Sequence, residues 1–139
     1  MVNDLPDYTK LIAISVDLPE NQQVIPRPKG GVQAVGDITT TASYQTVAEY
    51  AVTDDKQLQL TKIMISCDKD VQYKLVWDST DMSIEVIVPS NTPFTDWFPW
   101  DYYLMMGDGI KKIKLQAKYP TDGEAGTCFG EIIGEEVTP

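Results

Sequence analysis

The stretch Val71-Gln72-Tyr73-Lys74-Leu75-Val76-Trp77 decides the fold. Every second side chain from Val71 to Trp77 is apolar or aromatic, and Gln72 and Lys74 lie between them. Successive side chains of a β-strand point to opposite faces of a sheet. The alternation therefore predicts a strand with one face in a core and the other face in water.

The segments on either side repeat this pattern of short apolar stretches bounded by turns. Those predicted as strands are Tyr44–Val52, Leu58–Cys67, Ile84–Val88, Ile113–Tyr119 and Thr127–Ile133. Ile84, Val86 and Val88 are expected to form one of these strands, which Pro89 ends. About seven or eight short strands and no segment with helical periodicity predict an all-β fold. We expect an antiparallel β-sandwich of jelly-roll or Greek-key type.

One strand carries a local irregularity. In Leu58–Cys67 the apolar positions change parity near Thr61-Lys62. A shift of one residue turns every following side chain to the other face of the sheet. A β-bulge inserts one residue and corrects such a shift, so we predict a bulge at this point.

Residues 1–41 differ from the rest and are predicted to form an extended N-terminal arm, with the sandwich domain at 42–139. The arm begins with an alternating strand at about 11–18, with Ile12, Ile14 and Val16 on one face. Three prolines and Gly30-Gly31 follow, and we expect residues 19–41 to be an extended connection. The apolar face of the strand has to be buried, either in the chain's own sheet or in the sheet of a neighbouring subunit.

The stretch Phe94–Tyr103 holds six of the thirteen aromatic residues of the chain. Pro99 excludes a regular helix or a central strand, and we expect a connection that crosses between the two sheets. Its rings suit a core plug, a protein contact or a platform for sugar rings. The contact is expected to centre on Trp97 and Trp100, with Tyr102 and Tyr103 also facing a partner. Within the stretch, Trp97 and Phe98 are expected to turn toward the core.

Charge and composition exclude several classes of function. The chain has 21 acidic and 11 basic residues, a net charge of −10, and this argues against nucleic acid and anionic membranes as partners. It has no histidine, which excludes Ser-His and Cys-His catalysis and histidine-ligated metals. The paired aspartates, such as Asp68 and Asp70, lie at predicted turns, where Asp satisfies its own backbone. We therefore expect no enzymatic activity, no cofactor and no metal ion.

Two further features leave alternatives open. Cys67 and Cys128 lie in separate predicted strands, and they are either a reduced, buried pair or a disulfide between neighbouring strands. Lys112, Lys114 and Lys118 form a stripe on one strand face. That stripe is either a solvated face or a surface that pairs with an acidic neighbour, such as the acidic tail of another copy.

The order of strands and turns over roughly residues 42–137 resembles the small β-sandwich proteins of tailed-phage virions. These proteins include capsid decoration proteins and the heads of short fibres. The resemblance rests on the strands above, the proline-bounded aromatic stretch and the turn Gly107-Asp108-Gly109. It carries no shared site residues. It implies a structural virion protein that forms homo-oligomers and docks onto a major capsid protein or another virion component.

The expected role is therefore a non-enzymatic component of a virus particle. The first residues lack the basic start and apolar run of a secretion signal, so we expect synthesis in the host cytoplasm and a final location in the virion. Two other roles stay open. One is a carbohydrate-binding jelly-roll module, and the other is a subunit of an extracellular filament built by strand exchange.

Overall fold

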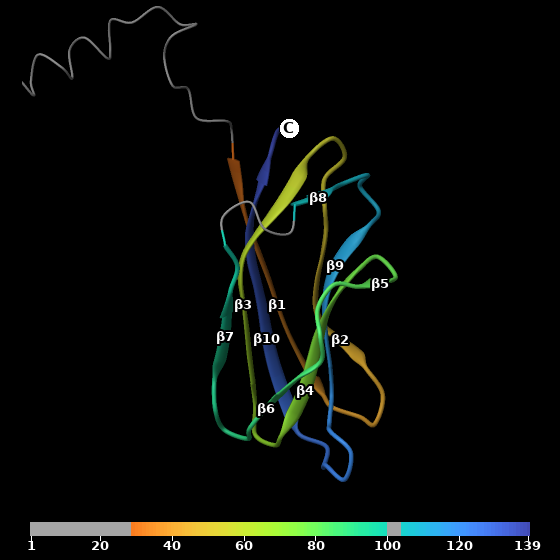
Figure 1. The fold of residues 1–139 in the computed structure, drawn as a ribbon, viewed down its shortest axis with the longest axis vertical. Helices are drawn as coiled ribbons and strands as arrows, with labels where there is room; N and C mark the ends of the chain where they lie inside the picture. Colours follow the sequence, from red (N-terminus) through yellow and green to blue (C-terminus); the bar gives the residue numbers. More distant parts are fainter. Residues whose placement is uncertain (1–28, 100–103) are drawn as a thin grey trace, which may run out of the picture.

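The structure is a computed structural model that describes residues 29–99 and 104–139. The described residues form ten strands (Figure 1). Their bounds are β1 Lys29–Thr39, β2 Gln45–Ala51, β3 Gln57–Cys67, β4 Val71–Trp77, β5 Thr80–Asp81, β6 Val86–Val88, β7 Phe94–Trp97, β8 Leu104–Met106, β9 Lys112–Lys118 and β10 Thr127–Val137. Four of these strands have four residues or fewer, and the six longer ones carry most of the pairing.

The strands form two antiparallel sheets that pack against each other. Sheet A has the order β1-β10-β3, and β7 and β8 lie end to end along the far edge of β3. Sheet B has the order β2-β9-β4, with β5 and β6 along the far edge of β4. Neighbours in each sheet are mostly distant in sequence, so connections pass from one sheet to the other. This arrangement confirms the predicted antiparallel β-sandwich.

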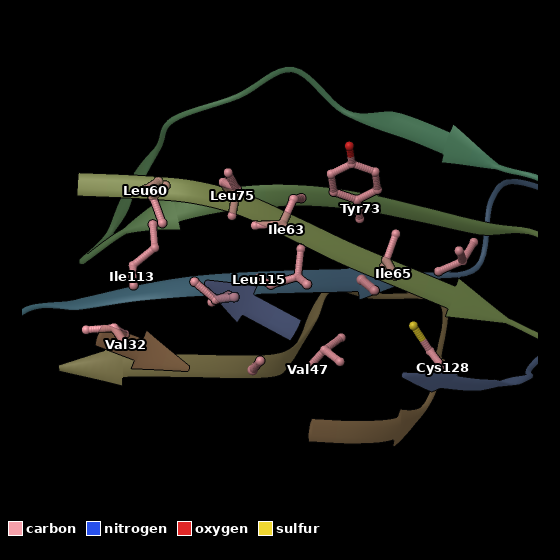
Figure 2. Close-up of a cluster of buried hydrophobic side chains, with 14 of the residues drawn as sticks. Val32, Val47, Leu60, Ile63, Ile65, Tyr73, Leu75, Ile113, Leu115 and Cys128 are labelled. Atoms are coloured by element: carbon pink, nitrogen blue, oxygen red, sulfur yellow. The ribbon is translucent and has the colours of Figure 1, made fainter. Parts of the chain in front are cut away.

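The core lies between the inner faces of the two sheets. Figure 2 shows side chains from β3 of sheet A against side chains from β4 and β9 of sheet B. The largest buried side chains in it are Leu58, Leu60, Ile63, Ile65, Tyr73, Leu75, Ile113, Leu115 and Ile132. The inward face predicted for the stretch 71–77 is confirmed, with Trp77 partly buried at its end.

The predicted bulge in β3 is confirmed. Ile133 of β10 lies opposite Lys62, whereas the next residue, Gly134, lies opposite Leu60. Thr61 is therefore the extra residue, and Leu60 and Ile63 both stay in the core. The carbonyl oxygen of Thr61 accepts a hydrogen bond from the backbone N–H of Phe98, with N and O 2.9 Å apart.

The prediction that residues 19–41 are a connection is wrong for residues 29–39. These residues form β1, which pairs with β10 over its whole length, from Lys29 opposite Val137 to Thr39 opposite Thr127. The last proline of the arm precedes this strand. Val32 is buried in the core, so residues 29–39 belong to the sandwich as well. The predicted strand at about 11–18 lies outside the described residues.

The predicted strand at 84–88 begins later than expected, at Val86, and Ile84 before it is 81% exposed. The chain leaves the ladder with β4 at this point. The backbone N–H of Leu75 donates to the hydroxyl of Ser83 rather than to a strand carbonyl, with N and Oγ 2.9 Å apart. Pairing resumes at β6, where Val88 is buried.

Candidate contact surface

The outer face of sheet A is the most apolar exposed surface of the described residues. Residues paired across antiparallel strands point to the same face, so the register defines which side chains share it. One row places Val35 beside Glu131 and Met64, and the neighbouring rows contribute Phe129, Ile133 and Trp97. Val35 is 56% exposed, Phe129 is 49% exposed and Trp97 is 64% exposed. We call Val35, Met64, Trp97, Phe129 and Ile133 the apolar face of sheet A.

Phe129 lines two neighbouring hollows on this face. The smaller, about 50 Å³, is lined by Met64, Pro93 and Phe94 together with Phe129. The larger, about 300 Å³, lies toward the end of the sheet and is lined by Asn91, Pro93 and Phe129 among others. A ring flanked by two shallow depressions can pack against the apolar side chains of a partner.

The aromatic stretch does not cross between the sheets, which corrects the prediction for its described part. Phe94–Trp97 is an edge strand of sheet A, and β8 after it pairs with the same strand, β3. The crossings lie before β7 and after β8. Because Trp97 pairs with Lys62, it points outward, contrary to the expectation that it faces the core. Phe98 is half-buried against the core, as expected.

Lys62 covers the ring of Trp97. Its ammonium nitrogen lies 4.7 Å from the ring centroid, a cation–π contact. The ring therefore has one face in contact with a cation of its own sheet. A sugar ring that stacked on this face would have to displace Lys62.

The other predicted contact residues, Ile12, Ile14, Val16, Trp100, Tyr102 and Tyr103, lie outside the described residues. What sequence reasoning missed is the set Val35, Met64, Phe129 and Ile133. Phe129 and Ile133 lie at alternate positions of a predicted strand, which gave a signal for one shared face. Val35 had no such signal, because the prolines and glycines before it indicate a connection rather than a strand.

The outer face of sheet B is mainly polar, although Ile87 beside Gln72 is 61% exposed on it. Lys74 pairs with Asp81 at 3.0 Å, and Lys112 pairs with Glu49 at 2.9 Å. The ammonium groups of Lys74 and Lys118 lie 4.4 Å and 5.2 Å from the ring centroid of Tyr44. Burial under these side chains is the main reason that the pKa of Tyr44 is raised to about 12. Lys112 and Lys118 of the lysine stripe thus have partners within their own chain.

The acidic tail also has partners within the chain. The Glu136 carboxylate accepts hydrogen bonds from the Tyr50 hydroxyl, at 2.7 Å, and from the backbone N–H of Thr53, at 2.8 Å. Partial burial opposes ionisation of Glu136, but these hydrogen bonds outweigh it and lower the pKa. They tie the end of β10 to the β2–β3 turn. Pairing of the lysine stripe with the tail of another copy stays a prediction.

The turn carboxylates of Asp68, Asp70 and Asp108 bind backbone N–H groups, within the same turn for Asp108 but on other segments for Asp68 and Asp70. Asp108 accepts hydrogen bonds from the N–H groups of Ile110 and Lys111, which lower its pKa. Asp68 and Asp70 accept from the N–H groups of Thr127 and Ser90. Within residues 29–99 and 104–139 there is no group of three or more Asp, Glu, Cys or His side chains that could hold a metal ion.

Comparisons of the chain with models of protein families, with curated proteins and with solved structures gave no match. In the part of the chain that the structure describes, no helix is long and apolar enough to cross a membrane.

Proposed function

We propose that this protein is a non-enzymatic structural component of a virus particle, either a capsid decoration protein or part of a fibre. Its copies join through the apolar face of sheet A. The observation that carries the proposal is the contrast between the two outer faces. On sheet B, Lys74 and Lys112 have aspartate, glutamate and tyrosine partners. On sheet A, the side chains of Val35, Phe129 and Trp97 are exposed to solvent. Contiguous exposed apolar residues are typical of contact sites.

The partner on this face is a second copy of the chain, which supplies its N-terminal residues. Ile12, Ile14 and Val16 alternate with more polar residues, as in a strand with one face to bury. The 28 residues before β1 span up to about 90 Å when fully extended. β1 itself, with 11 residues, spans only about 36 Å, so the arm is long enough to reach a neighbouring subunit.

The contact is tested by a double variant on the apolar face and a matched control. In Val35→Ser/Phe129→Ser, we expect the oligomer of the full chain to dissociate at concentrations where the wild type stays assembled. The control is Ile84→Ser/Ile87→Ser, which removes two apolar side chains that are also exposed but belong to the β4-edge region of sheet B. Light scattering coupled to size exclusion gives the mass. A monomeric wild type, or equal masses for both double variants, would overturn the contact.

Membership of a virus particle needs a separate test. Antibodies against the purified chain are applied to purified particles of the virus whose genome encodes it, and electron microscopy records the label. Regular labelling on heads or fibres supports the proposal, and particles without label contradict it. A glycan array gives the other decisive result, because a hit that is lost in Trp97→Ala favours the carbohydrate-binding module instead.

A further inference from the structure

The two cysteines of the chain lie directly opposite each other on neighbouring strands. Cys67 is the last residue of β3, and its Cα partner on β10 is Cys128. Both are free thiols, and both are buried, with Cys67 4% exposed and Cys128 0% exposed. Figure 2 shows the sulfur of Cys128 directed toward the core. Two thiols thus meet at one end of the sandwich, although 61 positions separate them in sequence.

The hydrogen bonds around the pair identify it as a non-hydrogen-bonded pair of the ladder. The carbonyl oxygen of Cys67 points away from β10, since it accepts a hydrogen bond from the N–H of Asn91 at 2.7 Å. The N–H of the next residue, Asp68, donates to the carbonyl oxygen of Thr127 at 3.3 Å. In a non-hydrogen-bonded pair the Cα atoms are about 4.5 Å apart and the side chains approach closely. That separation lies within the range of about 4.4–6.8 Å in which a disulfide forms.

One of the two cysteines lies at the wall of the larger hollow beside Phe129. Cys67 contributes to the lining of this hollow, of about 300 Å³, together with Asp68 and Asn91, and Cys128 does not. Burial, and then the charge of Cys67, raise the pKa of the Cys128 thiol to about 12. Cys67 is therefore the cysteine nearer to solvent, and we expect its thiol to react with a reagent before that of Cys128.

We propose that Cys67 and Cys128 are a modification site that low-molecular-weight disulfides such as glutathione disulfide convert into a cross-strand disulfide. In the first step the Cys67 sulfur, after losing its proton, attacks glutathione disulfide. A mixed disulfide forms at Cys67, and one glutathione leaves as a thiol. In the second step the Cys128 sulfur loses its proton and attacks the Cys67 sulfur, and the second glutathione leaves. The two cysteines are oxidised, and one glutathione disulfide is reduced to two glutathione thiols.

The new bond fixes β10 to β3 at the end where their ladder finishes. It closes a loop that contains β4 to β9, and both of the strands that it links belong to sheet A. Cross-links that close long loops restrict the unfolded chain strongly. For a loop of this length we expect the melting temperature to rise by roughly 10–20 °C. The reaction is slow, because both thiols are buried.

The test incubates the reduced full-length protein with an excess of glutathione disulfide under native conditions. Intact mass spectrometry is expected to show monomeric chains lighter by two hydrogen atoms, and the melting temperature rises in step with this species. Two variants separate the steps. Cys128→Ser is expected to stop at a stable glutathione adduct on Cys67, and Cys67→Ser is expected to leave Cys128 unmodified.

Three results would overturn the proposal. The first is that both thiols of the wild type stay free until the protein is unfolded, and the second is that only disulfide-linked dimers form. The third is that Cys128 in Cys67→Ser gains glutathione as fast as Cys67 does in Cys128→Ser. Alanine variants at the same positions replace the serine variants if a hydroxyl in the core prevents folding.

Discussion

At the scale of single residues, Tyr73 combines a well-packed ring with a buried hydroxyl that has no hydrogen-bond partner among the described residues. Its ring is buried and packs against Phe94, with the centroids 5.9 Å apart. Burial, and then the charge of Asp96, raise the pKa of Tyr73, so the hydroxyl stays neutral. Such a group opposes folding, because water satisfied it in the unfolded chain.

We therefore expect Tyr73→Phe to leave the free energy of unfolding unchanged or to raise it by about 1 kcal/mol. Urea unfolding measures this. Tyr50→Phe is the matched control, because the Tyr50 hydroxyl donates to Glu136 at 2.7 Å, and its loss is expected to cost about 1 kcal/mol. Equal losses in the two variants would mean that the Tyr73 hydroxyl does have a partner.

Glu136 predicts a pH dependence of stability. Its pKa in the folded chain is below that in the unfolded chain, which is about 4.3. The ionised carboxylate therefore stabilises the fold above about pH 4.3, and this contribution is lost as the pH falls through the lower, folded pKa. In Glu136→Gln we expect reduced stability at pH 7 and a smaller further loss on acidification. Thermal unfolding of both proteins from pH 7 to pH 3 checks this, and parallel curves would contradict it.

At the scale of elements, the closest contact between the sheets lies where β1 passes β2. A Cβ atom placed on Gly36 would lie only 1.9 Å from the carbonyl oxygen of Val47. Val47 is itself an extra residue, because Thr46 pairs with Gln116 and Ala48 with Leu115. A bulge in β2 thus pushes backbone against β1, and the glycine leaves room for it.

Gly36→Ala is expected to lower the free energy of unfolding by at least about 2 kcal/mol, because backbone has to move to admit the methyl group. Gly31→Ala on the same strand is the control, since a Cβ there meets nothing within 4 Å. We expect the control to change stability by less than about 0.5 kcal/mol. Chemical unfolding of the two variants decides the matter, and equal effects would refute a tight contact at Gly36.

The two bulges, at Thr61 and at Val47, differ in whether the sequence alone predicts them. The bulge at Thr61 was predictable, because apolar residues change parity around it. The bulge at Val47 was not, because Val47 and Ala48 are both apolar and both buried. β1 was missed because its pairing partner lies at the far end of the chain and two glycines precede its buried residues. The outward direction of Trp97 depends on its register with Lys62, which local sequence does not define.

At the scale of the whole molecule, the described residues form two sheets that share one core. Every described strand pairs with another described strand, and the core draws on both sheets. The proposed subunit contact, in contrast, needs residues 1–28. Folding and assembly are therefore expected to be separable.

Removal of residues 1–28 should leave the sandwich folded and abolish assembly. We expect the far-ultraviolet circular dichroism of a β protein and a cooperative thermal transition, together with a monomeric mass in sedimentation. The deletion has to end at residue 28, because Lys29 is the first residue of β1. A truncated chain that still assembles as the full chain does would show that the arm is not the occupant of the apolar face.

The pairing of Lys29 with Val137 has a mechanical consequence. β1 begins and β10 ends at the same end of the sandwich (Figure 1), and the two are neighbouring antiparallel strands. A force that pulls these two ends apart loads the hydrogen bonds between β1 and β10 one after another, so the strands unzip at low force. A force between the arm and the opposite end of sheet A loads the same bonds together, in shear. A subunit held by its arm thus resists tension along its strands far better than tension between its two ends.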